Sequence, residues 1–393
     1  MPTRTAVRLS TARDPAAAGR EAASAVLESL EGRVDLALVF ATVGYDQEAL
    51  LASVRAGLGA SSVIAGCSGE GVISGGDSQE VDHAVSVMGI AFDGVSAEAE
   101  LVDGYATDPE GAAHELARRV QGRSDVLGLL VFPDGLGGDC SRFLRVLERE
   151  LPDVTVVGGT SGDAMTFERT YQYGDDRVRT GAVSAVVLRG RGELRVAVSH
   201  GCTPCGPHQT ITRIDGNWVE EIDGRPAWDV FKEFLDGDPQ DLNAEGIVHL
   251  CIGISADPAA QFVSDPMVIR TPLSLNKENG ALLFPGGGLR KGQRIRITRR
   301  DGERIRLTAA SCARRVLGTE GRLPAFVLQF DCAGRGKVMF GDCAAAEIIE
   351  PLRAEIGRRV PWAGFHTYGE IAATEYGLDY HNYTVALCAF YDA

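Results

Sequence analysis

Two similar stretches decide the fold of this chain: VIAGCSGEG at residues 63–71 and VVGGTSGDA at residues 156–164. Each has the pattern of a buried strand followed by a turn of small residues and an acidic side chain. A recurrence of this kind predicts two copies of one folding unit. The aligned pairs, at an offset of 93 residues, are Gly66 with Gly159, Ser68 with Ser161, Gly69 with Gly162, and Glu70 with Asp163.

The flanking sequence repeats in the same order. An apolar strand at 35–40, DLALVF, is echoed at 125–132 by DVLGLLVF, and a helical pattern follows each strand. Each copy is therefore expected to be a β-α-β-β unit, at about 34–104 and about 125–201, within an α/β N-terminal domain of residues 1–201. The apolar positions that align between the two helices are Leu51, Val54 and Leu58 with Leu144, Leu147 and Leu151.

The second half, 202–393, has a different pattern and is expected to be an α+β domain with a mainly antiparallel sheet and few helices. Pro226 suits a helix start, and its apolar face runs to about Leu235. A loop is expected at 236–241, and one further helix at 344–357. The expected strands, separated by glycine-rich and charged turns, are 247–254, 267–275, 281–287, 294–300, 305–310 and 325–332.

Composition agrees with a soluble globular protein of two domains. The chain has 393 residues, of which 45% are hydrophobic and 24% charged. Its formal net charge of −15 disfavours nucleic acid and anionic membranes as partners. We find no signal peptide and no apolar run long enough for a membrane span, so a cytoplasmic protein is expected.

The nine cysteines are an odd number and lie mostly within apolar stretches, which is typical of a reducing compartment. Cys202 and Cys205 form a CxxC, the spacing of a redox pair or of half a zinc site. No second CxxC or spaced histidine pair completes a zinc framework. A redox or metal enzyme centred on these two cysteines is therefore one hypothesis, ranked below those that follow.

A second feature is the polar segment GFHTYGEIAATEYGLDYHNYTVALCAFYD at 364–392, which ends in an apolar strand. A rigid strand beside imidazole, phenol, carboxylate and amide groups is a suitable frame for a binding site. Arg270, in an apolar strand, needs a carboxylate from the protein or from a ligand. Arg335, between two glycines, is expected in a tight turn with its side chain free to reach a pocket.

The chain resembles the FIST family. The motifs that carry the resemblance are SHGCTPCGPHQTIT at 199–212, NWVEEIDGRPAWDVF at 217–231, MVIRTPLSL at 267–275, FDCAGRGKVMFG at 330–341 and the polar segment at 364–392. The family consists of bacterial sensory proteins that bind small ligands and pass the signal to output modules. The resemblance therefore implies a FIST N-terminal domain at 1–201 and a FIST C-terminal domain at 202–393.

We find no nucleophile elbow, HExxH or paired-carboxylate signature, so the sequence predicts a sensor and no enzyme. The expected ligand is an amino acid or another small polar metabolite. The expected partner is a separate histidine kinase, cyclic-dinucleotide enzyme or chemoreceptor, and the chain itself could form a homo-oligomer. The predicted ligand-binding residues are Gly66, Ser68, Gly159, Ser161, Arg270, Arg335, Tyr368, Glu370, His381, Asn382 and Thr384.

An alternative, also taken from the resemblance, is a non-covalent haem b that senses nitric oxide. Haem iron needs an axial ligand, often histidine, in an apolar pocket. His249, His366 and His381 lie in the most apolar surroundings and are the candidate iron ligands. For the small-ligand hypothesis no metal is expected.

Overall fold

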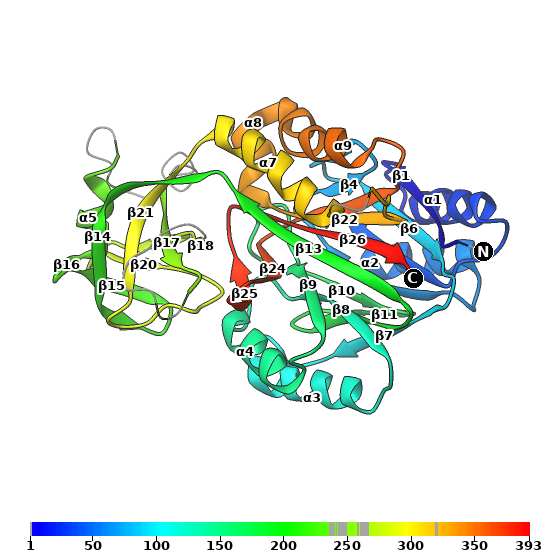
Figure 1. Ribbon diagram of the computed structural model, residues 1–393, viewed down its shortest axis with the longest axis horizontal. Coiled ribbons are helices and arrows are strands. Elements are labelled where there is room, and N and C mark those ends of the chain that lie inside the picture. The colour runs from blue at the N-terminus through cyan, green and yellow to red at the C-terminus, as the bar shows by residue number, and fades with distance from the viewer. Residues whose placement is uncertain are drawn as a thin grey trace.

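The computed structural model describes residues 2–235, 240, 242, 250–257, 259, 267–318 and 321–393. It is a mixed α/β structure with a large body and a smaller lobe (Figure 1). Three six-stranded sheets with helices on their outer sides form the body, and an eight-stranded antiparallel sheet forms the lobe.

The body contains three units with the same order of elements, β-α-β-α-β, then a hairpin, then a last strand. The first unit consists of β1 (Arg4–Ser10), α1 (Pro15–Ser29), β2 (Leu36–Ala41), α2 (Gln47–Leu58), β3 (Val63–Ser68), β4 (Val72–Ser74), β5 (Asp77–Gln79) and β6 (Val85–Ala91). The second consists of β7 (Val95–Val102), α3 (Pro109–Gln121), β8 (Val126–Pro133), α4 (Cys140–Glu150), β9 (Thr155–Thr160), β10 (Gln172–Gly174), β11 (Arg177–Arg179) and β12 (Val183–Gly190).

The third unit is interrupted by the lobe, which is inserted after its first strand. It consists of β13 (Gly192–His200), α7 (Gly302–Leu317), β22 (Phe326–Cys332), a helical stretch, β23 (Trp362–Thr367), β24 (Gly369–Thr374), β25 (Gly377–His381) and β26 (Thr384–Asp392). The helical stretch comprises η1 (Ala333–Arg335), α8 (Lys337–Phe340), η2 (Gly341–Cys343), η3 (Ala345–Ile349) and α9 (Glu350–Ile356).

The inserted lobe is built almost entirely of strands. Its sheet runs in the order β18-β17-β21-β14-β15-β20-β19, with β16 beside β15. Its elements are β14 (Cys202–Asp215), β15 (Trp218–Ile222), β16 (Arg225–Pro226), α5 (Ala227–Lys232), β17 (Leu250–Ser255), β18 (Met267–Arg270), β19 (Ser274–Asn276), β20 (Ala281–Leu283) and β21 (Arg294–Arg300).

The three units exchange their hairpins in a cycle. The β4–β5 hairpin of the first unit extends the third sheet beside β23, and the β10–β11 hairpin of the second unit extends the first sheet beside β3. The β24–β25 hairpin of the third unit extends the second sheet beside β9. Each sheet is therefore completed by a neighbouring unit.

Local sequence signals support the repeat. Five helices begin after an aspartate whose carboxylate accepts a hydrogen bond from a backbone N–H in the first turn, a cap worth about 1 kcal/mol. These caps are Asp14, Asp46, Asp108, Asp139 and Asp301. In the middle of the body, Phe40, Phe132 and Phe330 contribute one ring from each unit, with centroids 5.5 to 6.5 Å apart.

The structure corrects the register of the predicted repeat by one residue in the strands. Val39 lies opposite Gly66 in the first unit, and Val131 lies opposite Gly158 in the second. The equivalent of Gly66 is thus Gly158, at an offset of 92. The helix caps Asp46 and Asp139 keep the offset of 93, so the connecting turns absorb the difference.

The predicted β-α-β-β units at about 34–104 and about 125–201 are wrong in extent. The observed units begin at β1 and β7, each with a further strand and helix before the predicted start, and the body has a third unit. The third escapes notice because the inserted lobe separates its first strand from α7. Residues 305–310, predicted as a strand, lie within α7, whose buried positions Ile305, Ala309, Cys312, Ala313 and Val316 have helical spacing. The mainly antiparallel pattern expected of 202–393 holds for the inserted sheet, whereas β22 and β23 pair in parallel.

Other predicted elements occupy their expected places. The helix after Pro226 is α5, and the helical stretch expected at 344–357 contains η3 and α9. Of the loop expected at 236–241, all but residue 240 lies outside the described residues. The predicted boundary at 201/202 falls between β13 and β14, and the third sheet contains strands from both sides of it.

Candidate functional site

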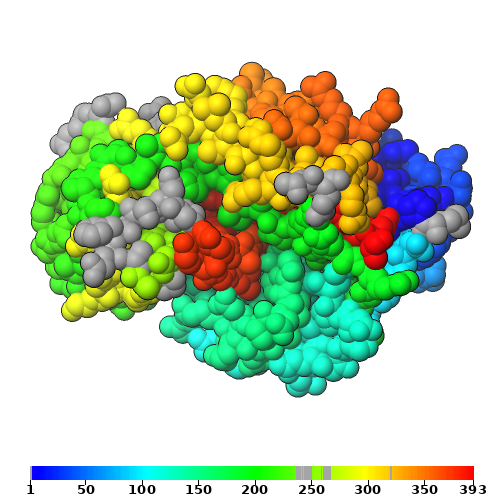
Figure 2. Space-filling view, viewed as in Figure 1, coloured from blue at the N-terminus to red at the C-terminus, as the bar shows by residue number. Residues whose placement is uncertain are grey.

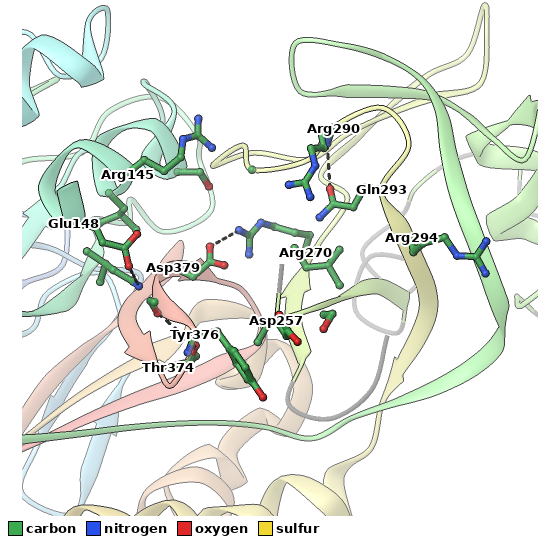
Figure 3. Close-up of a pocket in the computed structure, with 18 of the residues that line it drawn as sticks. Arg145, Glu148, Asp257, Arg270, Arg290, Gln293, Arg294, Thr374, Tyr376 and Asp379 are labelled. Carbon is green, nitrogen blue, oxygen red and sulfur yellow. Dashed lines mark hydrogen bonds and ion pairs between the residues drawn. The ribbon is translucent and has the colours of Figure 1, made fainter. Parts of the chain in front are cut away.

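A cavity of about 440 Å³ lies where the inserted lobe meets the body (Figure 3). Its walls come from α4, the ends of β17 and β18, the segment that leads into β21, and the β24–β25 hairpin. In Figure 2 this hairpin, in red-orange, is seated between the lobe and the helices of the second unit. The cavity is thus formed by parts of the chain that are distant in sequence.

Arg270, on the inserted lobe, binds the body at this cavity. Its guanidinium, 1% exposed, lies 2.8 Å from the carboxylate of Asp379 on β25, through Nη2. Nε donates to the carbonyl of Gly287 at 3.1 Å, and Nη1 donates to the carbonyls of Ile269 and Tyr380. A guanidinium has five N–H groups, so these contacts leave one Nη2 donor available in a residue that lines the cavity.

The cavity is rich in arginine. Besides Arg270, its lining includes Arg145 from α4 and Arg290 and Arg294 from the approach to β21 and its first residue. The acidic lining residues are Glu148, Asp257 and Asp379. Arg294 is directed away (Figure 3), so three arginines and three carboxylates line the cavity, and its capacity for an anion depends on which arginines lack a partner.

Two of these arginines are free to engage a ligand. Within the described part of the chain, the side chains of Arg145 and Arg290 make no ion pair or hydrogen bond. Figure 3 shows Arg145 and Arg290 above Arg270, to its left and right, with Arg294 directed away. By contrast, Glu148 accepts a hydrogen bond from the backbone N–H of Leu378 at 2.8 Å and fastens β25 to α4.

A second polar cluster, Glu70, Asp163 and Tyr368, lies where β3, β9 and β23 end. Three backbone hydrogen bonds connect these strand ends in a ring: Glu70 to the carbonyl of His366, Gly162 to that of Ser68, and Tyr368 to that of Thr160. The Tyr368 hydroxyl donates to the carboxylate of Asp163 and accepts from the backbone N–H of Met165. The cluster therefore ties the three units together.

Asp163 also organises the loop that follows it. Ala164, Met165 and Phe167 all have left-handed backbone conformations, with φ of 54 to 60°. Such strain persists only where surrounding contacts outweigh it. The Asp163 carboxylate accepts from the backbone N–H groups of Phe167, Glu168 and Arg169, and the Phe167 ring stacks on Tyr368 with centroids 5.3 Å apart.

Glu70 is a neutral acid near neutral pH. Burial, followed by the nearby charges of Glu80 and Asp163, raises its pKa to about 8, and these effects outweigh its hydrogen bonds with Met165 and Tyr368. One of its carboxylate oxygens, Oε2, is buried without a hydrogen-bond partner among the described residues. Protonation removes the buried negative charge of the Glu70 carboxylate.

Glu70→Gln is expected to change how stability depends on pH. The raised pKa means that the folded protein holds a proton that the unfolded chain releases, so stability is full below about pH 4.5 and falls as the pH rises toward 8. The glutamine variant should therefore gain stability relative to the parent between about pH 5.5 and about pH 8.5, by urea unfolding. Glu28→Gln, on the exposed face of α1, should show no such change; equal pH slopes for Glu70→Gln and the parent would refute the assignment.

The four predicted residues of the glycine turns support the sheets and do not line the cavity between the inserted lobe and the body. Gly66 passes close to β2, and Gly159 packs against Thr367. The Ser68 hydroxyl donates to the carbonyl of Gly162 at 2.7 Å, and that of Ser161 donates to the carbonyl of Pro133 at 3.0 Å.

Arg335 is buried, contrary to the expectation of a side chain free to reach a pocket. Its Nε lies 3.0 Å from the Asp331 carboxylate, although the two atoms are not aligned as a hydrogen bond, and Nη1 donates to the carbonyl of Ser199. Both side chains are at most 1% exposed. The turn expected around Arg335 is η1, which directs the guanidinium into the core.

Glu370, His381, Asn382 and Thr384 are buried and bonded to the protein. Glu370 accepts from the hydroxyl of Thr367 at 2.5 Å and from the backbone N–H of Thr384, and burial raises its pKa. His381 Nε2 lies 3.2 Å from the carbonyl of Ala372. The side-chain amide of Asn382 donates to the backbone carbonyl of Tyr368, and the backbone carbonyl of Asn382 accepts from the hydroxyl of Thr384.

Two of the three candidate haem ligands, His366 and His381, are buried and contact other protein groups. His366 is fully buried, its Nε2 lies 2.7 Å from the hydroxyl of Ser78, and burial lowers its pKa to about 4. Neither His366 nor His381 lines the cavity between the inserted lobe and the body. His249 lies outside the described residues.

Of the predicted ligand-binding residues, only Arg270 lines the cavity between the lobes. Four other residues of the lining were not predicted from the sequence: Arg145, Glu148, Arg290 and Asp379. Asp379 lies within the polar segment at 364–392, so its carboxylate was a signal that could have paired it with Arg270. Arg145 and Glu148 on α4, and Arg290 in the segment before β21, have no comparable feature in the sequence.

Solved structures of cyanuric acid hydrolase align with this chain along nearly its whole length. The protein from A. caulinodans is 9% identical, with 98% of this chain and 99% of that chain covered and a TM-score of 0.40. A second such structure is 10% identical, with complete coverage of both chains and a TM-score of 0.34. These matches contradict the expectation of no enzyme, which is withdrawn; likeness at this level assigns no reaction.

Relatives by sequence are uncharacterized proteins. One from Mycobacterium tuberculosis is 29% identical over 413 residues, which cover 99% of this chain and 100% of that protein. One from Mycobacterium bovis is 29% identical over 337 residues, 84% of this chain and 83% of that protein. One from Methanocaldococcus jannaschii is 28% identical over 182 residues, 43% of this chain and 34% of that protein.

Among the described helices, none combines the length and apolar character that crossing a membrane requires. The FIST N domain matches residues 35–225, and the FIST C domain matches residues 227–373. FIST domains are sensory domains of signal transduction. The chain belongs to the FIST family.

Proposed function

We propose that this protein senses a small organic anion, such as an amino acid or another small carboxylic acid, in the cavity between its two lobes. The observation that carries the proposal is that the side chains of Arg145 and Arg290 have no ion pair or hydrogen bond among the described residues, while Arg270 keeps one donor. Arginine binds carboxylate and phosphate through two parallel N–H bonds, which favours an anion as the occupant.

The volume of about 440 Å³ is within the range of small-molecule sites. A ligand carboxylate between Arg145 and Arg290 would neutralise two like charges that otherwise lie in one cavity. The carboxylates of Asp257 and Glu148, on the same lining, suit the ammonium group of an amino acid. Charge complementarity therefore supports a small acid, with amino acids as the first class to test.

Signalling would follow from the position of the cavity. Its walls belong to both the body and the inserted lobe, so a ligand that contacts both changes the free energy of their packing. A separate protein that reads the packing of the lobes, such as a histidine kinase, a cyclic-dinucleotide enzyme or a chemoreceptor, would receive the signal. The Arg270–Asp379 ion pair is the described contact that the ligand would reinforce or displace.

Arg145→Ala and Arg290→Ala are each expected to weaken binding by about 10- to 150-fold, because each removes one charge-assisted contact worth about 1.5 to 3 kcal/mol. Screening of amino acids, other carboxylates and phosphate esters by thermal shift should first find a stabiliser, since a ligand of the native state raises the melting temperature. Calorimetry with that compound then compares the variants.

Arg149→Ala is the matched control, because Arg149 is on α4 as well, is exposed and does not line the cavity. Its affinity should equal that of the parent. Equal affinities for Arg145→Ala, Arg290→Ala and the control would place binding elsewhere. A screen in which no anion stabilises the parent, repeated by calorimetry, would contradict the proposal itself.

A further inference from the structure

Sulfur is concentrated in one buried cluster at the base of the inserted lobe. The cluster contains Cys202, at the start of β14, Cys251 on β17, Met267 on β18 and Cys332 at the end of β22, together with Ile269 and Tyr383. Four of its six side chains carry sulfur, and each of the six is at most 5% exposed. Thiolate and thioether sulfur are the ligands that select soft metal ions.

Two of these sulfurs are spaced as metal ligands. The Sγ atoms of Cys202 and Cys251 are 3.7 Å apart. With metal–sulfur bonds of about 2.3 Å, two ligands at tetrahedral or trigonal angles are separated by about 3.8 to 4.0 Å. The observed separation therefore needs only a small adjustment to accept an ion, whereas a disulfide would require the sulfurs to close to about 2 Å.

The surroundings of the pair have an uncompensated positive charge. Arg300, at the end of β21, is 5% exposed, and its Nε and Nη2 have no hydrogen-bond partner among the described residues. Its guanidinium lies over the ring of Tyr383, a member of the cluster, at 4.0 Å from the ring centroid. A buried guanidinium in apolar surroundings is costly unless an anion accompanies it.

Cys251 lies between two groups that can hydrogen-bond to its sulfur. Its Sγ is 3.7 Å from Cys202 Sγ and 3.0 Å from the hydroxyl of Thr298. A hydroxyl that donates to a ligating sulfur stabilises the negative charge of the thiolate, which is the form that binds metals.

We propose that Cys202 and Cys251 bind one copper(I) ion, with the Met267 thioether as the additional sulfur available to it. Binding converts two thiols and Cu⁺ into a dithiolate complex of charge −1 and releases two protons. That single negative charge matches the single positive charge of Arg300. The site is independent of the anion cavity and of the function proposed for it.

Zinc fits this arrangement less well. A structural zinc ion takes four ligands, and the described residues contain no group of three or more His, Cys, Asp or Glu side chains that could hold a metal. A dithiolate complex of Zn²⁺ would also be neutral and leave Arg300 uncompensated. Charge and ligand number both favour a monovalent soft ion.

The test is a titration of the reduced full chain with Cu(I), without oxygen, in competition with a colorimetric Cu(I) chelator. One Cu(I) per chain is expected, and X-ray absorption of the loaded protein should show sulfur neighbours at about 2.3 Å. Cys202→Ser and Cys251→Ser should each lose stoichiometric binding. Arg300→Gln should weaken it by about tenfold, as changes around metal ligands do.

Cys205→Ser is the matched control, because Cys205 is the second cysteine of the CxxC and lies outside the cluster. It should bind Cu(I) like the parent. Loss of binding in Cys205→Ser with retention in Cys251→Ser would overturn the proposal in favour of the CxxC. Absence of copper uptake by the parent, or a first shell of nitrogen and oxygen, would overturn it without reliance on any variant's folding.

Discussion

Gly66→Ala is expected to destabilise the protein by more than about 4 kcal/mol, enough to prevent folding of many domains. A Cβ at this position would lie 1.9 Å from the carbonyl oxygen of Val39 on the adjacent strand β2, and φ is +149°. The backbone oxygen cannot move away without breaking the parallel pairing of β2 and β3. Glycine is required here by the sheet, whether or not a ligand is present.

The same alanine substitution at Gly122 is the control, because its φ of −72° is ordinary and no atom lies within 4 Å of an added Cβ. Gly122→Ala should be neutral or slightly stabilising. Chemical unfolding of both variants, or soluble expression where Gly66→Ala does not fold, provides the comparison. A stable Gly66→Ala protein that had lost only ligand affinity would instead support the predicted role of Gly66 in binding.

Arg335→Met is expected to reduce the free energy of unfolding by about 3 to 5 kcal/mol, because it leaves the fully buried Asp331 carboxylate without its cation. Burial already raises the Asp331 pKa, and Arg335 is the largest influence that opposes the rise. Without Arg335 the pKa rises further, so the loss should be smaller at low pH, where Asp331 is protonated in both states, and larger as the pH increases.

Arg314→Met provides the comparison at the surface, where Arg314 pairs with Glu355 at 3.2 Å and is 61% exposed. Surface ion pairs are worth about 0 to 1 kcal/mol, so this variant should unfold almost like the parent. Urea unfolding at two pH values measures both variants. Equal stabilities for the two would mean that Arg335 serves something other than the core.

The fold could be predicted in part because its repeated strands are short and apolar. The stretches at 63–71 and 156–164 revealed the first two units, but the alignment was one residue out, since glycine pairs at 158 and 159 look alike in sequence. Only the backbone contact at Val131 identifies Gly158 as the equivalent residue. The third unit was missed because the inserted lobe separates β13 from α7.

The candidate site could be predicted only where one residue carried its own signal. Arg270 was found because a guanidinium in an apolar strand demands a partner. Arg145 and Arg290 are ordinary surface arginines in sequence and acquire meaning only when α4 and the inserted lobe come together. Conversely, Glu370 and His381 gave a strong polar signal, which the structure explains by hydrogen bonds inside the body.

Because the hairpins are exchanged in a cycle, some strands are synthesised long before the strands with which they pair. The β4–β5 hairpin emerges early, yet its partner strand begins at Trp362, and Ser74 lies opposite Ala363. The strand β13 likewise has no partner on one side until β26 (Thr384–Asp392) has been synthesised. The edges of β4, β9 and β13 therefore stay unpaired until residues 362–392 have been synthesised and have closed the third unit onto the other two.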